Sequence, residues 1–194
     1  MRRYGLVLLV LLLAAFPASP AAWGGEGHRL IMERAITLLP PEMRPAFEKE
    51  KAVLIERSVD PDLWRLVGFE EEAPNHFLDY DAYGPYPFAA LPADYGVALQ
   101  KYGRETLVKN GLLPWRAAEI YGNLVRAFEA QKAGRGSSNA VYLAAVLSHY
   151  VADAHMPLHG VVNYDGQLTN QPGIHGRFEG DLVRRFRDRL TFSP

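Results

Sequence analysis

The sequence predicts an all-α fold, and three observations lead to this prediction. Apolar residues recur at helical spacing in several segments, and Pro- and Gly-containing loops separate those segments. No segment shows the apolar–polar alternation of a half-buried strand. The 194 residues are 48% hydrophobic and 22% charged, which is typical of one globular domain, so we expect a compact multi-helix domain.

The first half of the chain contains two expected helices. Apolar spacing predicts a helix over 28–39, which Pro40 and Pro41 end, and a second short helix over 45–57. The stretch 84–92 has three prolines and two aromatic residues, and we expect it to be a surface loop.

The second half contains four expected helices. They cover 93–102, 115–132, 140–155 and 174–190. Pro114 suits the first turn of the second of these, and Gly134–Ser138 is a linker. We expect Ser138 to cap the strongly apolar third helix and Pro157 to end it, with an irregular segment over 160–173.

Composition and periodicity exclude several classes of protein. The chain has no cysteine, so disulfide scaffolds and thiolate metal sites are excluded. A formal charge of −1 disfavours a protein that binds nucleic acid stably through a basic surface. No repeat with a period of 20–50 residues is visible, which argues against a solenoid.

Residues 1–22 have the pattern of a secretory signal peptide. Arg2 and Arg3 precede an apolar run over 5–16, and small residues dominate 17–22. The apolar run is shorter than the roughly 20 residues that span a bilayer, although an uncleaved anchor is the alternative. We therefore expect export to the periplasm or the cell exterior.

The position of cleavage has two candidates. Cleavage after Ala22 would place Pro20 where signal peptidase prefers a small residue, whereas cleavage after Ala21 would place Ser19 there. In either case we expect 23–194 to form the functional domain, with no transmembrane segment in the mature chain.

Histidines carry most of the candidate chemistry. The chain has six: His28, His76, His149, His155, His159 and His175. His149 and Asp153 are four residues apart within an expected helix, so both side chains project from one face. His175 and Glu179 repeat this spacing on the last helix. Zinc prefers imidazole and carboxylate ligands, although surface ion pairs or a buried Asp–His or Asp–Arg pair would produce the same spacing.

Three motifs together resemble a known family. They are HYVADAHMPLH from His149 to His159, WGGEGH from Trp23 to His28, and HGRFE from His175 to Glu179. Their order is similar to that of the zinc-dependent phospholipase C and single-strand-specific nuclease superfamily. The resemblance implies an α-helical domain that binds three zinc ions and cleaves phosphate esters.

The resemblance also implies a full set of metal ligands. They are Trp23, His28, Asp62, His76, His149, Asp153, His159, His175 and Glu179. One zinc would take Asp62, His76 and His149, a second Trp23 and His28, and a third His159, His175 and Glu179. Asp153 would bridge the first two zincs.

Two acidic residues compete for one ligand position. Asp60 and Asp62 both lie in the sequence VDPDLWR, and we prefer Asp62 because Pro61 precedes it and Arg65 follows three residues later. His155 falls outside the implied ligand set, and we expect a helix-end role or one supporting the ligands.

The implied set suits phosphate chemistry. Bound zinc attracts a phosphodiester despite the negative protein and lowers the pKa of a coordinated water toward 7. Asp62 and Arg65 are the expected catalytic residues, with Arg65 stabilising charge on phosphoryl oxygens. A surface ion pair with Asp62 is the alternative for Arg65.

The sequence leaves the substrate open. Glu179 matches the phospholipase branch, whereas the short spacing from Trp23 to His28 is similar to that of the nucleases. Glu26 could meet a cationic head group or remain solvated. A group of aromatic residues could line a lipid or base pocket, or pack a loop: Tyr80, Tyr83, Tyr86 and Phe88.

Three functions remain as hypotheses. The first is a phospholipase C-like hydrolase, the second a single-strand nuclease or nucleotidase, and the third a non-catalytic exported zinc-binding protein. Familiar members of the superfamily continue with further helices after the position of Glu179, so the chain is either a compact version or truncated.

Cleavage of the signal peptide would affect one of the expected ligands, Trp23. The resemblance implies that Trp23 binds zinc through its amino and carbonyl groups, and an amide nitrogen is a poor donor to zinc. Cleavage after Ala22 would create the free amine five residues before His28.

Overall fold

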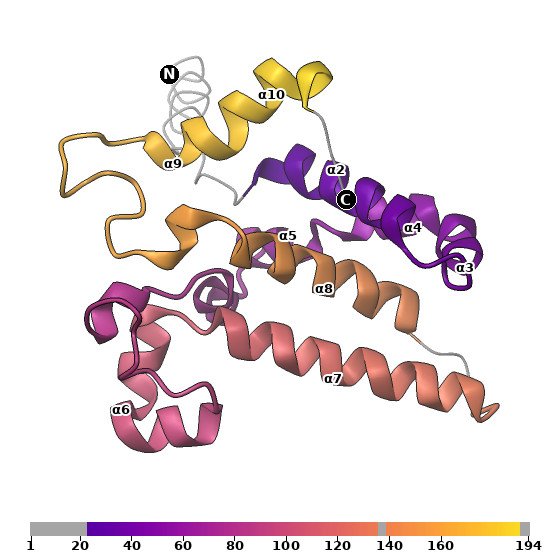
Figure 1. The fold of residues 1–194 in the computed structure, drawn as a ribbon, viewed down its shortest axis with the longest axis horizontal. Helices are drawn as coiled ribbons and strands as arrows, with labels where there is room; N and C mark the ends of the chain where they lie inside the picture. Colours follow the sequence, from indigo (N-terminus) through magenta and orange to yellow (C-terminus); the bar gives the residue numbers. More distant parts are fainter. Residues whose placement is uncertain (1–22, 136–138, 191–194) are drawn as a thin grey trace, which may run out of the picture.

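The computed structural model describes residues 23–135 and 139–190, and all regular elements in these ranges are helices (Figure 1). This confirms the predicted all-α fold. The expected signal peptide, 1–22, lies outside the described residues. Within the described ranges, none of the helices combines the length and apolar character needed to span a membrane.

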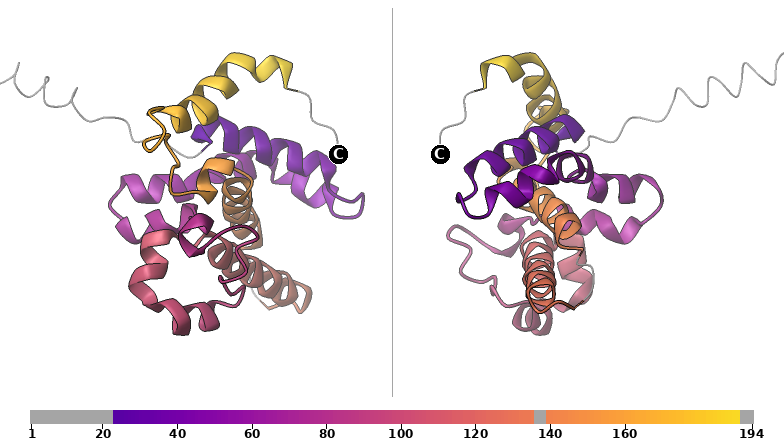
Figure 2. Two further views of the ribbon diagram at one scale, coloured as in Figure 1. Left: turned by 60° about the vertical axis from the view of Figure 1, so that its left-hand side comes forward. Right: turned by 90° about the vertical axis from the view of Figure 1, so that its right-hand side faces the viewer.

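Helix α8 (Ala140–Ala154) is the central element. Helix α7 (Leu113–Lys132) runs antiparallel to it on one side, while α2 (Gly24–Leu38) and α4 (Lys51–Arg57) pack on the other side (Figure 1). Both views in Figure 2 place α8 between α2 and α7. Because neighbouring helices cover α8 on two sides, His149 and Asp153 in its C-terminal half are buried.

Side-chain size explains how α8 fits between its neighbours. Ala144 and Ala145 are buried, and these small residues let α2 and α4 approach closely. Met32, Ile36 and Leu54 complete this cluster. A second apolar cluster fills the interface with α7: Leu113, Ile120, Val146 and Tyr150. Helix α8 therefore packs apolar side chains against its neighbours on two faces, which accounts for its strongly apolar sequence.

The N-terminal helices differ in part from the prediction. The helix expected over 45–57 is two helices, α3 (Arg44–Lys49) and α4, because the backbone at Glu50 leaves the helical conformation with φ −101° and ψ 10°. Two further elements had no counterpart in the prediction, α5 (Asp60–Leu66) and the 3₁₀ helix η1 (Glu70–His76).

The middle of the chain forms a separate small cluster. Helix α6 (Tyr95–Asn110) extends beyond the expected 93–102, and a positive φ of 76° at Gly103 introduces a kink that glycine tolerates. The side chain of Asp94 caps α6 by accepting a hydrogen bond from the Val97 backbone N–H at 2.8 Å. The expected loop over 84–92 contains no helix or strand, and 3₁₀ helix η2 (Tyr80–Tyr83) precedes it.

The start of α8 departs from the predicted cap. Ser138, the expected cap, lies outside the described residues, and α8 begins after Asn139, whose side chain makes no capping hydrogen bond. At the other end, α8 ends at Ala154, before Pro157 as predicted, and the 3₁₀ helix η3 (Pro157–Gly160) follows.

The C-terminal segment is less regular than predicted. The single helix expected over 174–190 consists of α9 (Ile174–Gly176), a π-helical turn η4 (Arg177–Asp181), α10 (Leu182–Phe186) and the 3₁₀ turn η5 (Arg187–Arg189). This segment packs against α2, and it lies at the upper edge of Figure 1. Its π turn carries Glu179, and π turns inside helices often mark functional sites.

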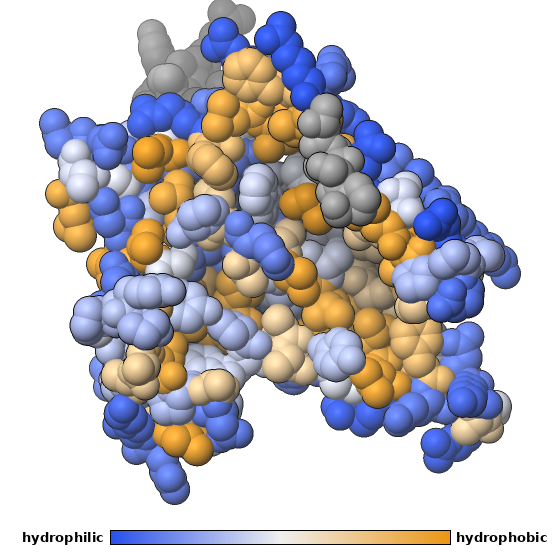
Figure 3. Space-filling model, in the orientation of Figure 1, coloured by the Kyte–Doolittle hydropathy of each residue, from blue (hydrophilic) through white to orange (hydrophobic). Residues whose placement is uncertain are grey.

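The surface is mixed in polarity. On the face drawn in Figure 3, hydrophilic residues dominate the outer rim, whereas hydrophobic residues are concentrated toward the middle and the upper part. Part of the apolar surface of the helices is therefore exposed on this face.

Candidate metal centre

Among residues 23–135 and 139–190, eight buried side chains form three groups whose ligand-type atoms lie within 4.8 Å of one another, and each group could hold a metal ion. The groups are Asp62, His76 and His149; His28, His149 and Asp153; and His159, His175 and Glu179. They come from α2, α5, η1, α8, η3, α9 and η4, so folding brings together residues from most of the chain.

The separations within the first group, and from it to Asp153, bracket those of a tetrahedral metal site. His76 Nδ1 lies 2.9 Å from Asp153 Oδ2 and 3.1 Å from His149 Nε2. Asp62 Oδ1 lies 3.9 Å from His76 Nδ1 and 4.0 Å from His149 Nε2. Ligands about 2.0–2.2 Å from a tetrahedral zinc ion lie about 3.3–3.6 Å from one another, which falls within this range of separations.

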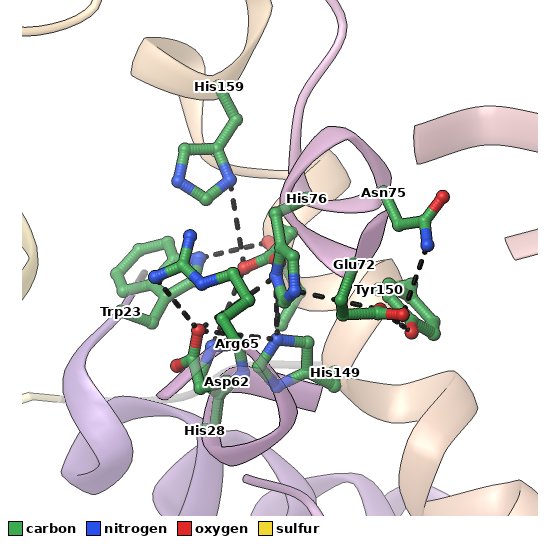
Figure 4. A network of polar contacts seen from close by, with 12 residues as sticks. Trp23, His28, Asp62, Arg65, Glu72, Asn75, His76, His149, Tyr150 and His159 are labelled. Carbon is green, nitrogen blue, oxygen red and sulfur yellow. Dashed lines mark hydrogen bonds and ion pairs between the residues drawn. The ribbon is translucent and has the colours of Figure 1, made fainter. Parts of the chain in front are cut away.

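The orientation of His149 leaves one nitrogen for a metal. Its Nδ1–H donates to the backbone carbonyl of Ser58 at 2.9 Å, which directs Nε2 toward the centre of the group. Figure 4 shows Nε2 of His149 facing His76, with Asp62 on the other side. Burial lowers the pKa of His149, so its ring is neutral and suited to ligation.

The second group joins α2 to the end of α8. His28 Nε2 lies 3.5 Å from Asp153 Oδ1, and the His28 ring stacks on the ring of His149 with centroids 3.8 Å apart. Trp23 lies at the same end of α8, because its indole N–H donates to the carbonyl of Ala152 at 2.9 Å. The role of Trp23 as a metal ligand stays a prediction.

The third group combines η3 with the C-terminal segment. Glu179 Oε1 lies 3.1 Å from His159 Nε2, and Glu179 Oε2 lies 2.9 Å from His175 Nε2. His175 Nδ1–H donates to the carbonyl of Tyr164 at 3.2 Å, which leaves Nε2 for the group. His159 Nδ1 lies 3.6 Å from Asp153 Oδ1, so the third group adjoins the other two.

Several carboxylate oxygens in the centre are buried without a hydrogen bond. Both oxygens of Asp62 and Oδ1 of Asp153 are in this position. Burial raises the pKa of Asp62 to about 6 and raises that of Asp153 well above its ordinary value. Such oxygens are costly unless a partner satisfies them, and a divalent cation is a partner of the right charge.

The charge balance also favours a cation. Asp62, Asp153 and Glu179 are three acids within one buried region. Burial raises the pKa of Glu179, but the close contacts of its oxygens with His159 and His175 together lower it by more, and the net result is a lowered pKa. Burial lowers the pKa of His76, which lies beside Asp62 and Asp153. The His76 ring is therefore neutral and does not balance the charge of these two acids. The residues present therefore fit one or more bound divalent cations.

A cavity of about 570 Å³ opens beside these groups. His76, His159 and His175 line it, together with Arg65 and Lys109 from two other elements. Arg65 is partly exposed, and its Nη2 lies 3.6 Å from Asp62 Oδ1. A ligand in this cavity would therefore contact both the metal groups and two cationic side chains.

The structure separates the two candidate acids of α5. Asp62 lies in the first group, whereas Asp60 pairs with Arg57, with Oδ2 3.7 Å from Nη1. His155 is exposed at the end of α8, where its Nδ1–H donates to the carbonyl of Val151 at 2.7 Å. His155 thus lies outside the three groups.

The aromatic loop residues have different surroundings. Tyr83 is buried in an apolar cluster with Leu78, Ala98 and Leu107, and this favours the packing role. Tyr80 lines a smaller cavity of about 320 Å³ that also reaches Asp153 and His159. None of the four aromatic residues lines the larger cavity beside Arg65.

Two other candidate residues lie elsewhere on the surface. Tyr86 is 85% exposed and has no part in a pocket beside the metal groups. Glu26 pairs with Arg187 at 2.6 Å, so it is engaged with the C-terminal segment.

Sequence reasoning missed Glu72. This residue is buried and its Oε1 lies 3.7 Å from His76 Nε2. The pair is separated by four positions, as are His149 with Asp153 and His175 with Glu179. The four-residue spacing of an acid and a histidine could therefore have identified Glu72, although here the acid comes before the histidine rather than after it.

Comparisons with family models, curated proteins and solved structures found no match to this chain.

Proposed function

We propose that this chain is an exported zinc-dependent hydrolase of phosphate esters, similar in chemistry to the phospholipases C. One observation carries the proposal: three buried histidine–carboxylate groups adjoin one another, and members of the first and third groups line a cavity that Arg65 also lines. Isolated ion pairs would not require this concentration of buried acids beside the imidazoles of His76 and His149, whose pKa values burial lowers.

Three zinc ions would occupy the three groups. Asp153 is suited to bridge two of them, because Oδ2 faces His76 and His149 while Oδ1 faces His28. The third ion would take His159, His175 and Glu179. Zinc, when bound, would lower the pKa of a coordinated water toward 7 and withdraw charge from phosphoryl oxygens.

The residues of the chain would then bind and orient the ester. Arg65 reaches the cavity from α5, and its guanidinium would donate hydrogen bonds to phosphoryl oxygens as charge develops on them. Its contact with Asp62 holds the guanidinium near the metal groups. Asp62 would act as a metal ligand, and its carboxylate would add negative charge to the site.

Two features bear on the substrate. The cavity wall includes the apolar residues Leu66, Phe77 and Leu158, which suits the glycerol and first acyl carbons of a lipid ester. Glu179 also matches the phospholipase branch. The five-residue spacing between Trp23 and His28 supports the second candidate, a single-strand nuclease or nucleotidase.

Metal analysis followed by assay tests the proposal. The purified secreted protein would be analysed for bound metals, then tested on phosphatidylcholine vesicles, single-stranded DNA and nucleoside monophosphates before and after chelation. We expect zinc and a chelator-sensitive hydrolysis of phosphatidylcholine. Hydrolysis of DNA or mononucleotides alone would select the second candidate, and zinc without any turnover would identify a non-catalytic zinc-binding protein.

A further inference from the structure

We propose that Glu72 is a positioning residue, which orients His76 so that Nδ1 is the atom presented to the metal. This inference rests on the proposed zinc site and adds a residue to it. Glu72 stands on the opposite side of the His76 ring from Asp153: Oε1 lies 3.7 Å from Nε2, whereas Asp153 Oδ2 lies 2.9 Å from Nδ1.

The two nitrogens of His76 have different surroundings. Nδ1 faces the first metal group, and Nε2 is buried without a hydrogen bond. Figure 4 shows the ring between His149 on one side and Glu72 on the other. The 3.7 Å separation exceeds a hydrogen bond, and a small rotation of the ring toward Glu72 would bring Nε2–H into donating range. A carboxylate in this position fixes the tautomer with the proton on Nε2.

Glu72 is itself held by three neighbours. Tyr150 O–H donates to Oε1, and the amide of Asn75 donates to Oε2 at 3.1 Å. Arg116 Nη2 lies 3.8 Å from Oε2, and its Nε–H donates to the Tyr150 oxygen at 3.3 Å. Because these contacts come from η1, α7 and α8, the carboxylate of Glu72 has one well-defined position.

The neighbours of Glu72 also supply an opposite charge and hydrogen-bond donors, which a buried carboxylate needs as partners. Arg116 supplies the charge, and Tyr150 and Asn75 supply the donors. An anionic acceptor behind the imidazole raises the basicity of the ligating nitrogen, and loss of such a partner typically costs about 10–100-fold in metal affinity.

Tyr150 connects this support to a second ligand. It follows His149 directly on α8, and the two rings meet edge to face with centroids 5.6 Å apart. One helix turn therefore supplies both a ligand of the first group and the hydroxyl that holds Glu72.

The test compares Glu72→Gln with Glu71→Gln. The two variants make the same chemical change at neighbouring positions, but Glu71 is exposed. Zinc affinity would be measured by competition with a chromophoric chelator, and the metal geometry by the visible spectrum of the cobalt-substituted protein. We expect Glu72→Gln to bind one zinc about 10–100-fold more weakly and to shift the cobalt bands, with Glu71→Gln like the unaltered protein.

Tyr150→Phe provides a second variant if Glu72→Gln does not fold. It keeps the ring and the carboxylate but removes the hydroxyl donor, so we expect a smaller loss of affinity and a smaller spectral shift. Unchanged zinc affinity and cobalt spectrum in a folded Glu72→Gln, or in Tyr150→Phe if only that variant folds, would overturn the positioning role while leaving the zinc site intact. Unaltered protein that binds no zinc would instead refute the proposed function.

Discussion

Asp153 Oδ2 lies 2.9 Å from Nδ1 of His76, although 77 residues separate the two in the sequence. The other oxygen of Asp153 lies 3.5 Å from Nε2 of His28 and 3.6 Å from Nδ1 of His159. One carboxylate at the end of α8 therefore contacts residues of all three metal groups. This arrangement makes Asp153 the side chain whose removal should affect the site most.

Asp153→Asn should reduce zinc binding by two ions per chain. The amide keeps the size of the side chain but removes the charge and one acceptor oxygen, so it cannot bridge two cations. Zinc content by mass spectrometry measures the effect. His155→Ala is the matched control, because His155 lies two residues away but is exposed and bonded to its own helix. Equal zinc loss in both variants would contradict the assignment.

Arg65→Ala should retain its zinc and slow hydrolysis by about 100-fold or more, which is the scale for losing one donor to the transition state. Arg65 lines the cavity but stands outside the three ligand groups. Arg57→Ala is the control, since Arg57 is an exposed arginine that pairs with Asp60. Full activity of Arg65→Ala would contradict the catalytic role and leave Arg65 only as an ion-pair partner of Asp62.

The pH dependence of the metal-free protein should reflect Asp62. Its pKa in the folded state is raised by burial to about 6, from an ordinary value of 3.8. The unfolded chain therefore releases this proton more readily, and ionised Asp62 destabilises the metal-free fold above pH 6. As the pH falls through 6 toward 4, this destabilisation disappears because the folded state takes up the proton first.

Asp62→Asn isolates that contribution from those of the histidines. Metal-free Asp62→Asn should be more stable than metal-free unaltered protein at pH 7, and the difference should shrink between pH 6 and pH 4. Urea unfolding at several pH values in the presence of a chelator measures both proteins. A difference that stays constant over this range would show that Asp62 does not titrate with a raised pKa.

Signal cleavage should activate the protein if Trp23 is an amino-terminal ligand. The indole N–H of Trp23 donates to the carbonyl of Ala152, the residue before Asp153, so Trp23 lies at the end of α8 where the second group is found. Protein that retains Ala22 should bind one zinc more weakly and hydrolyse substrate more slowly than protein beginning at Trp23. Amino-terminal sequencing identifies the natural form, and a secreted, fully active protein that begins at Ala22 would contradict this role.

Some parts of the fold were predictable because the signals are local. The spacing of apolar residues in 115–132 and 140–155 reflects helices with long continuous apolar stripes, and these correspond closely to α7 and α8. Helix α5 was missed because its seven residues are too short for a periodic pattern, although Asp60 and Pro61 are typical of a helix start. The π turn around Glu179 was equally hidden, since it changes the backbone without changing the sequence period.

The candidate site was predictable to a similar extent. Ligand-type residues stand out by residue type and by four-residue spacing, so His149, Asp153, His175 and Glu179 could be selected from the sequence. The supports behind them could not, because they depend on contacts between distant segments. The carbonyl of Ser58 behind His149 is such a case, as is the hydroxyl of Tyr150 behind Glu72.

The most direct test of the account is a zinc titration of metal-free protein, with hydrolysis of an activated phosphodiester followed at each addition. We predict that activity returns with zinc and reaches its plateau at three zinc ions per chain, with Asp153→Asn remaining inactive throughout. Protein that binds no zinc, or that binds three ions and hydrolyses no phosphate ester, would contradict the account.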